Sequence, residues 1–142
     1  MFLAICLGAL MTNIILKDLI ARPRPFETMQ VYFTWWEAAG AVPEDGFSFP
    51  SGHATAVSAG MISLALTQRN VRTFLIALTT MLLMGLARVY LFAHYPTDVL
   101  AGFLVGMLAA YIAFVLTHHI FVTRNPMIAA PKNPAGTSKR GR

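Results

Sequence analysis

Two long apolar stretches, residues 71–92 and 98–122, most constrain what this chain can fold into. About 20 helical residues cross the ~30 Å hydrocarbon core of a bilayer, and both stretches reach that length. A third stretch, 1–16, is apolar but shorter, and a fourth, 54–67, reaches a usable length only if its helix begins near Ser51. The pattern predicts an all-α fold: a polytopic transmembrane helical bundle with about four spans.

The composition of the 142-residue chain supports this fold class. Apolar residues make up 56% of the chain and charged residues 12%, whereas an average soluble domain carries about 25% charged residues. This balance excludes an ordinary soluble domain, and the surplus of apolar residues excludes intrinsic disorder. Cys6 is the one cysteine, so neither an intramolecular disulfide nor a cysteine-rich metal site can form.

Short connectors and the positions of the charges predict the topology. Residues 68–70 link two helices into an antiparallel hairpin, and residues 94–97 make the next link at the opposite membrane face. Cytoplasmic loops collect Lys and Arg. The face with the first connector and the C-terminal tail has seven basic residues and no acidic ones: Arg69, Arg72, Arg124, Lys132, Lys139, Arg140 and Arg142. We therefore expect this face to be cytoplasmic.

The other face carries all six acidic residues and is expected to be the outer one. We thus expect a multi-pass protein of the cell membrane, with a membrane domain at 1–122 and a disordered, basic cytoplasmic tail at 123–142. The net charge of +5 then reports membrane orientation, and no nucleic-acid partner is expected. A signal peptide is the alternative for residues 1–16, but no basic region precedes them and no small-residue cleavage site stands before Lys17.

Ionisable residues cluster at the outer ends of the expected helices. Such groups within or beside membrane spans are costly and usually functional. The hairpin returns His53 and His94, which are 41 residues apart, to the same depth. Histidines, a carboxylate and several cations suit phosphoryl transfer, in which the protein neutralises a phosphoryl group while one residue attacks and another protonates the leaving oxygen.

The residue types suggest a role for each group. Asp98 follows His94 by four residues, so its carboxylate can accept the imidazole N–H and leave the other nitrogen free to attack. His94 is therefore the candidate nucleophile, and His53 the candidate general acid and base. Backbone N–H groups at a helix start and nearby cations would hold the phosphate; the candidates are Lys17, Arg24, Ser51, Gly52 and Arg88.

Three motifs at these positions resemble the type 2 phosphatidic acid phosphatase superfamily, which also includes acid phosphatases and vanadium haloperoxidases. The motifs are Lys17 and, after six residues, Arg24-Pro25; then Pro50-Ser51-Gly52-His53; then Arg88, five residues, His94, three residues and Asp98. The resemblance covers residues 17–98. It implies a membrane phosphatase without metal or cofactor, which hydrolyses a lipid phosphate or isoprenyl diphosphate through a phosphohistidine on His94, and it implies the roles given above.

The chain departs from the family pattern at two points. Ala87 stands where the family usually has a serine, which removes one hydroxyl contact to phosphate. Membrane members resemble six-helix proteins, so with four spans we expect the missing N-terminal helices to lie before Met1. The Arg-Pro repeat at 22–25 also makes Arg22 a second candidate for the first motif; Arg24 is chosen on family spacing, with Arg22 as a bystander or lid contact.

Alternatives for the function and for two local patterns stay open. The main alternative is a catalytically inactive truncated membrane protein that retains a phosphate-binding site; the short first span favours it, and the intact His94 and Asp98 oppose it. The expected partners are membrane lipids and the lipid phosphate substrate, with a homo-oligomer left open. Gly102 and Gly106 predict close helix packing. The aromatic residues at 32–36 predict an interfacial belt, with a grip on a lipid chain as the alternative.

Overall fold

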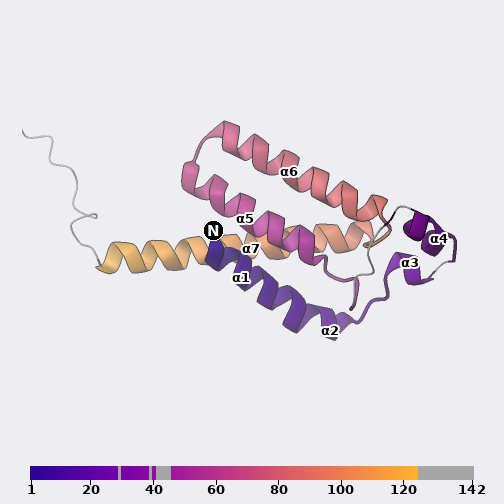
Figure 1. Cartoon of the computed structure of the whole chain (residues 1–142). Helices are drawn as coiled ribbons and strands as arrows, with labels where there is room; N and C mark the ends of the chain where they lie inside the picture. The colour runs from indigo at the N-terminus through magenta and orange to yellow at the C-terminus, as the bar shows by residue number, and fades with distance from the viewer. Residues whose placement is uncertain (29, 39, 41–45, 125–142) are drawn as a thin grey trace, which may run out of the picture.

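The computed structural model describes residues 1–28, 30–38, 40 and 46–124, and every regular element in them is a helix. The first helical stretch runs through α1 (Phe2–Leu10), a π-helical segment η1 (Met11–Leu16) and α2 (Lys17–Ile20). Two short helices, α3 (Pro25–Thr28) and α4 (Gln30–Ala38), precede the three long ones, α5 (Gly52–Gln68), α6 (Val71–Tyr90) and α7 (Pro96–Arg124). Figure 1 shows α1, α5, α6 and α7 packed as a bundle, with α3 and α4 at one end. The predicted all-α fold is confirmed.

Three stretches of the described chain are long and apolar enough to cross a membrane: Phe2–Thr28, Val71–Tyr90 and Pro96–Phe121. The fourth expected span, α5, has 17 residues, which is the short end of the range for a spanning helix, about 17 to 25 residues. The expected tail at 123–142 lies outside the described residues, except that α7 continues to Arg124.

The hairpin between α5 and α6 forms where the connector predicted it. α5 ends at Gln68, Arg69 has a left-handed φ of 50°, and α6 begins at Val71. The side chain of Asn70 accepts the backbone N–H of Thr73 at 2.8 Å and so caps α6. The link therefore reverses the chain within two residues.

The loop between α6 and α7 is slightly longer than expected. α6 ends at Tyr90, close to Phe92, whose φ of 51° cannot continue a right-handed helix. α7 begins at Pro96, a residue well suited to the first helical position. Residues 91–95 therefore form the loop that carries His94.

Close contact between α5 and α7 depends on the two glycines that the sequence singled out. A Cβ on Gly106 would lie 2.4 Å from the carbonyl oxygen of Thr55, and one on Gly102 would lie 2.6 Å from that of Ser51. Both distances are shorter than any real Cβ contact, so only glycine fits. The prediction that these glycines serve helix packing is confirmed.

Small and polar side chains tie α1 into the same bundle. Ala4, Ala59, Ala110 and Ala113 form a buried cluster between α1, α5 and α7. The hydroxyl of Thr12 donates to that of Thr55 at 3.0 Å. Interhelical hydrogen bonds and small residues are what holds helices together in lipid. The first stretch is thereby fixed relative to the start of α5.

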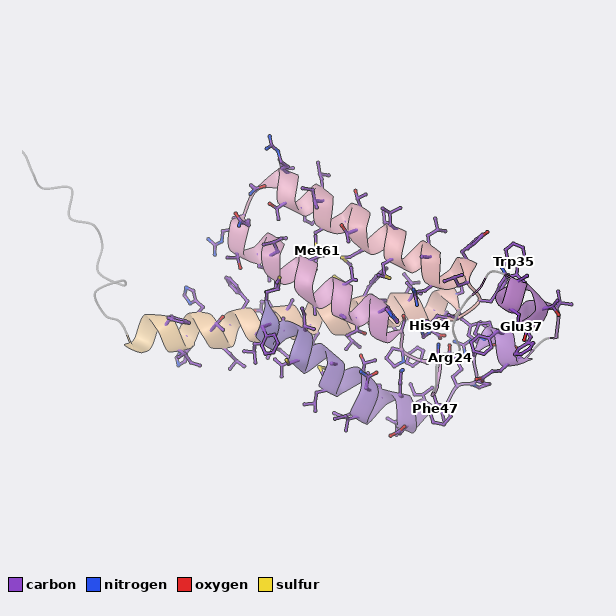
Figure 2. All side chains as sticks on the ribbon, viewed as in Figure 1. Arg24, Trp35, Glu37, Phe47, Met61 and His94 are labelled. Carbon is purple, nitrogen blue, oxygen red and sulfur yellow. The ribbon has the colours of Figure 1, made fainter. Side chains whose placement is uncertain are left out.

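The aromatic connector packs on the end of α6. Trp35 of α4 makes an edge-to-face contact with Tyr90, with ring centroids 5.9 Å apart. Figure 2 shows Trp35 at the end of the bundle that also holds Arg24 and His94. The side chains of Tyr32 and Trp36 lie outside the described part of the chain.

Candidate active site

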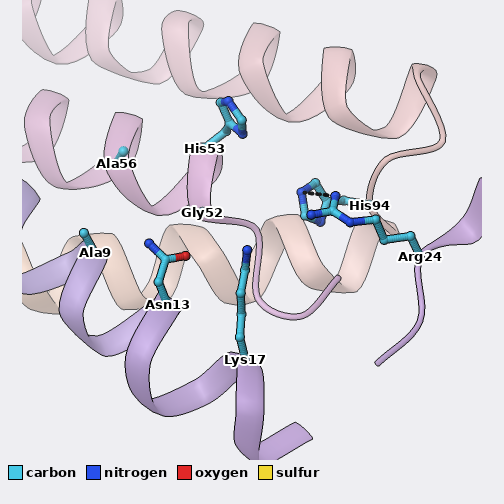
Figure 3. Close-up of a pocket in the computed structure, with 8 residues that line it drawn as sticks. All are labelled: Ala9, Asn13, Lys17, Arg24, Gly52, His53, Ala56 and His94. Atoms are coloured by element: carbon cyan, nitrogen blue, oxygen red, sulfur yellow. Dashed lines mark hydrogen bonds between the residues drawn. The ribbon is translucent and has the colours of Figure 1, made fainter. Parts of the chain in front are cut away.

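A pocket of about 420 Å³ lies where the three motifs meet (Figure 3). Its volume is in the range typical of small-molecule sites. It is lined by Ala9, Asn13, Lys17, Arg24, Gly52, His53, Ala56 and His94. The structure therefore brings five of the expected site residues, from all three motifs, into one cavity.

Close packing of the helices explains why these residues meet. Lys17 begins α2, the last part of the first helical stretch, and Gly52 and His53 form the first turn of α5. The end of the first stretch and the start of α5 therefore lie on the same side of the bundle. The side chain of Ser51 caps α5 by accepting the N–H of Ala54 at 3.4 Å. The backbone N–H of Ser51 donates to the carbonyl oxygen of Asp98 at 3.0 Å, which joins the start of α5 to that of α7.

The imidazole of His94 is held with one nitrogen directed at the pocket. The residue is 2% exposed, and its Nδ1 lies 2.8 Å from the carbonyl oxygen of Ser48. A carbonyl oxygen can only accept a hydrogen bond, so this contact assigns the proton to Nδ1. Nε2, which lies 3.5 Å from Nη1 of Arg24, then carries the lone pair that can attack a phosphorus atom.

The carboxylate of Asp98 does not touch the imidazole in the way that the spacing predicted. Its Oδ2 lies 3.9 Å from Nδ1 of His94, beyond hydrogen-bond distance. Asp98 stands in the first turn of α7, where Oδ2 accepts the N–H of Tyr95 at 2.9 Å and the hydroxyl of Ser48. This capping interaction turns the carboxylate toward the loop, and the carbonyl of Ser48 becomes the nearer partner of Nδ1.

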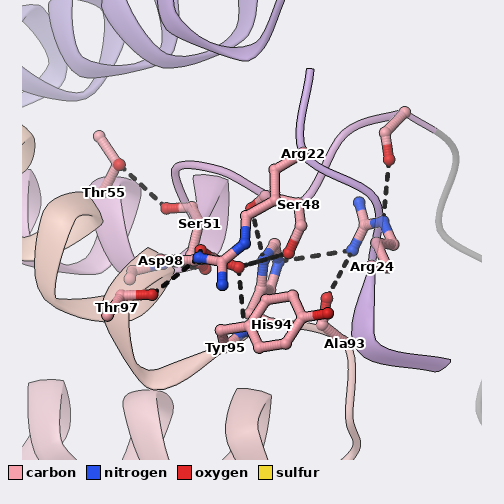
Figure 4. A network of polar contacts seen from close by, with 12 residues as sticks. Arg22, Arg24, Ser48, Ser51, Thr55, Ala93, His94, Tyr95, Thr97 and Asp98 are labelled. Carbon is pink, nitrogen blue, oxygen red and sulfur yellow. Dashed lines mark hydrogen bonds and ion pairs between the residues drawn. The ribbon is translucent and has the colours of Figure 1, made fainter. Parts of the chain in front are cut away.

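Two further residues surround Asp98 (Figure 4): Arg22, which the sequence left as the second candidate for the first motif, and Ser48, which it did not assign to the site. Nη1 of Arg22 lies 2.7 Å from Oδ1 of Asp98 and donates to the hydroxyl of Thr97 at 2.8 Å. The Arg22 guanidinium also stacks 3.8 Å above the ring centroid of Tyr95. The sequence signal for Arg22 was the Arg-Pro repeat; Ser48 had no signal beyond its place just before the second motif.

Arg24 lines the pocket next to the imidazole of His94. It is 1% exposed; its Nε donates to the carbonyl of Gly46 at 2.9 Å and its Nη1 to that of Ala93 at 3.2 Å. These contacts fix the plane of a buried guanidinium against the pocket. An arginine held in this way offers a rigid positive charge to an anion.

Two expected phosphate contacts lie beside the pocket. Among the described residues that line it, neither Ser51 nor Arg88 is present. Ser51 is buried as the cap of α5, and the carbonyl of Arg88 accepts the backbone N–H of His94 at 3.4 Å. The described residues also contain no group of three histidine, cysteine or acidic side chains placed to hold a metal ion.

Comparisons with known proteins give a consistent result. Residues 1–121 match the model of the PAP2 superfamily. The chain is 33% identical over 109 residues to phosphatidylglycerophosphatase B of Bacillus subtilis, which covers 70% of this chain and 48% of that protein. It is 32% identical over 97 residues to undecaprenyl-diphosphatase of Sulfolobus acidocaldarius (68% and 44%) and 37% identical over 109 residues to lipid A 1-phosphatase of Rhizobium etli (75% and 44%).

The matched region is a part of each relative. The chain spans about half the length of the curated relatives it matches. No solved structure matches it.

Proposed function

Because this chain belongs to the PAP2 superfamily, we propose that it is a metal-independent membrane phosphatase that hydrolyses a lipid phosphate or isoprenyl diphosphate through a phosphohistidine on His94. One observation carries the proposal: Lys17, Arg24, His53 and His94, from three separate motifs, line one pocket. The relatives named as phosphatases of phosphatidylglycerophosphate, undecaprenyl diphosphate and lipid A support a lipid substrate.

In the first step, Nε2 of His94 attacks the phosphorus atom. The new N–P bond forms as the bond from phosphorus to the leaving oxygen breaks, and His53 donates a proton to that oxygen. Arg24 and Lys17 neutralise the charge on the equatorial oxygens, and the N–H groups at the start of α5, including that of Gly52, add donors. A half-buried Arg88 contributes a further positive charge next to the loop that carries His94.

In the second step, water hydrolyses the phosphoenzyme. His53 takes a proton from the water, the oxygen attacks phosphorus, and the N–P bond breaks to release inorganic phosphate and neutral His94. Over the two steps, one phosphoester or phosphoanhydride bond is broken and one water molecule is consumed. No metal ion takes part, because the cations of the pocket supply the neutralising charge.

Ser48, Asp98 and Arg22 act on the nucleophile without touching the substrate. Phosphorylation of Nε2 leaves a positive charge on the ring, which the Ser48 carbonyl at 2.8 Å and the Asp98 carboxylate at 3.9 Å stabilise. Arg22 and the hydroxyl of Ser48 hold that carboxylate in place. We therefore assign Asp98, Arg22 and Ser48 as positioning residues, and Ser51 as the residue that orients the first turn of α5.

The charge pattern supports an active site on the outer face of the cell membrane. The pocket lies at the end of the bundle opposite Arg69 of the connector and Arg72 at the start of α6. Lysine and arginine favour the cytoplasmic side. A lipid phosphate bound at the outer membrane surface would keep its headgroup near water and its hydrocarbon chain at the depth of the bilayer.

The test is turnover and labelling of the purified membrane protein. With a lipid phosphate carrying phosphorus-32, we expect phosphate release and an acid-labile, base-stable label on His94. The His94→Ala variant should lose both. An unlabelled wild-type protein that binds phosphate without turnover would instead support the inactive, phosphate-binding alternative, and wild-type rates in His94→Ala would contradict the assignment of the nucleophile.

A further inference from the structure

The pocket extends beyond the end that handles phosphate. Figure 3 shows Arg24 and His94 at one end, and Ala9 and Ala56 at the other, with Lys17 and His53 between them. The first helical stretch runs toward the motifs, so Ala9 precedes Lys17 by about two turns. α5 runs away from them, so Ala56 lies one turn beyond Gly52. The alanine end is thus the deeper one in the bundle.

The lining of the pocket changes character along this direction. The basic and titratable groups stand at and next to the His94 end, whereas the deep end is bounded by the methyl groups of Ala9 and Ala56, both half-buried. Asn13 lies between the two parts as a neutral polar group, and its Oδ1 would lie 3.5 Å from a Cβ on Gly52. A charged end that continues into an apolar end matches a phosphate ester with a hydrocarbon leaving group.

The geometry of attack directs the leaving group into this deep end. In phosphoryl transfer the attacking and leaving atoms are roughly in line with phosphorus between them. If Nε2 of His94 attacks, the leaving oxygen faces away from His94 and therefore toward His53, Ala9 and Ala56. His53, the proposed proton donor, lies on that path (Figure 3).

We propose that the part of the pocket between Ala9 of α1 and Ala56 of α5 binds the hydrocarbon chain of the leaving group, and that the small side chains at these two positions admit long-chain lipid phosphates. This inference rests on the proposed function, because it places the substrate by the attack of His94. Asn13 contacts the polar atoms at the junction between headgroup and chain.

The experiment compares two esters that differ in the length of the leaving group, ethyl phosphate and hexadecyl phosphate. In Ala9→Leu and Ala56→Leu, kcat/KM for hexadecyl phosphate should fall about tenfold or more, since added methylenes fill the path of the chain. Turnover of ethyl phosphate should stay within about threefold of wild type, which also reports that the variants are folded.

A matched control fills a second cavity, with an apolar lining, at this end of the bundle. That cavity, of about 570 Å³, is lined by Val31, Trp35, Leu86, Val89, Tyr90 and Phe92. Val89→Phe should leave both esters unaffected. Selective loss of hexadecyl phosphate in Val89→Phe, with none in the alanine variants, would place the chain between α4 and α6 and overturn the inference.

Binding measurements separate this inference from the proposed chemistry. In the His94→Ala background, which cannot form a phosphoenzyme, Ala9→Leu should weaken binding of hexadecyl phosphate about tenfold and leave binding of ethyl phosphate unchanged. Equal changes for both esters, or none for either, would overturn the subsite even if His94 proves to be the nucleophile. A selective change would support it even if the wild type shows no turnover.

Discussion

Replacing Arg22 with glutamine tests whether the nucleophile is held through Asp98. Arg22 contributes an ion pair of 2.7 Å to the buried carboxylate, a hydrogen bond to Thr97 and a stacking contact on Tyr95. Within the described residues it does not line the pocket. Arg22→Gln should therefore lower kcat and leave KM within about twofold of wild type, the result of losing an interaction that acts only on the chemical step.

The size of the effect follows from the burial of the two partners. Breaking a fully buried pair costs about 3 to 5 kcal/mol. The side chain of Arg22 is 35% exposed, however, while that of Asp98 is 0% exposed, so water screens the pair and a cost of about 1 to 2 kcal/mol is expected. Asp98 also keeps its bonds to Tyr95 and Ser48. If the full cost of losing this ion pair is added to the activation barrier of the chemical step, kcat falls roughly 5- to 30-fold.

The assay is steady-state hydrolysis of a lipid phosphate in detergent, combined with a double-mutant cycle. In the Asp98→Asn background, Arg22→Gln should cost less than about twofold, because its partner charge is already absent. Arg22→Lys should recover part of the activity, since it keeps the charge but not the planar contact with Tyr95. Arg72→Gln, at the exposed start of α6, serves as the neutral control.

Two outcomes would refute this reasoning. Additive effects of Arg22→Gln and Asp98→Asn would show that Arg22 does not act through the carboxylate. A rise in KM at unchanged kcat would show that Arg22 binds the phosphate directly, in the role proposed for Arg24.

Three further predictions address the orienting carboxylate, the metal-free site and the helix packing. Asp98→Asn should lower kcat more than about tenfold with little change in KM; a kcat within about threefold of wild type would reduce Asp98 to a cap of α7. Phosphatase activity should survive EDTA and be inhibited by orthovanadate, because Lys17 and Arg24 supply the neutralising charge; loss with chelator and recovery with Mg²⁺ or Zn²⁺ would contradict this. Gly106→Ala should destabilise the fold by about 1 to 3 kcal/mol, since its Cβ would lie 2.4 Å from the carbonyl of Thr55, whereas Gly60→Ala meets Ile5 at 3.5 Å and should be tolerated; equal melting temperatures in thermal unfolding would refute the packing argument.

The fold class and the position of the pocket's main residues followed from local properties of the sequence. Uninterrupted apolar runs determine membrane helices because a bilayer leaves few alternatives for a chain of that composition. Short connectors then determine which ends of α5, α6 and α7 meet, which is why His53 and His94 were expected on one face. Lys17 ends the apolar run that precedes them and was expected on the same face, and all three residues line one pocket. The packing role of Gly102 and Gly106 could also be predicted from a local property, because their spacing places them on one helix face.

The roles around the nucleophile depended on the tertiary structure. Residues 21–24 are not helical, so no periodicity tells which arginine faces the pocket. Two contacts decide it. The backbone N–H of Ser48 donates to the carbonyl oxygen of Arg22 at 2.8 Å, and Nη1 of the buried Arg24 donates to the carbonyl oxygen of Ala93. Likewise, the four-residue step to Asp98 is compatible with a direct bond to His94, but the first turn of α7 turns the carboxylate toward the N–H of Tyr95. Contacts between segments some 25 to 75 residues apart decide the placement of the two arginines, and the local bond to Tyr95 decides that of the Asp98 carboxylate. Neither kind of contact follows from the spacing of residue types, because backbone groups, which every residue carries, take part in most of them.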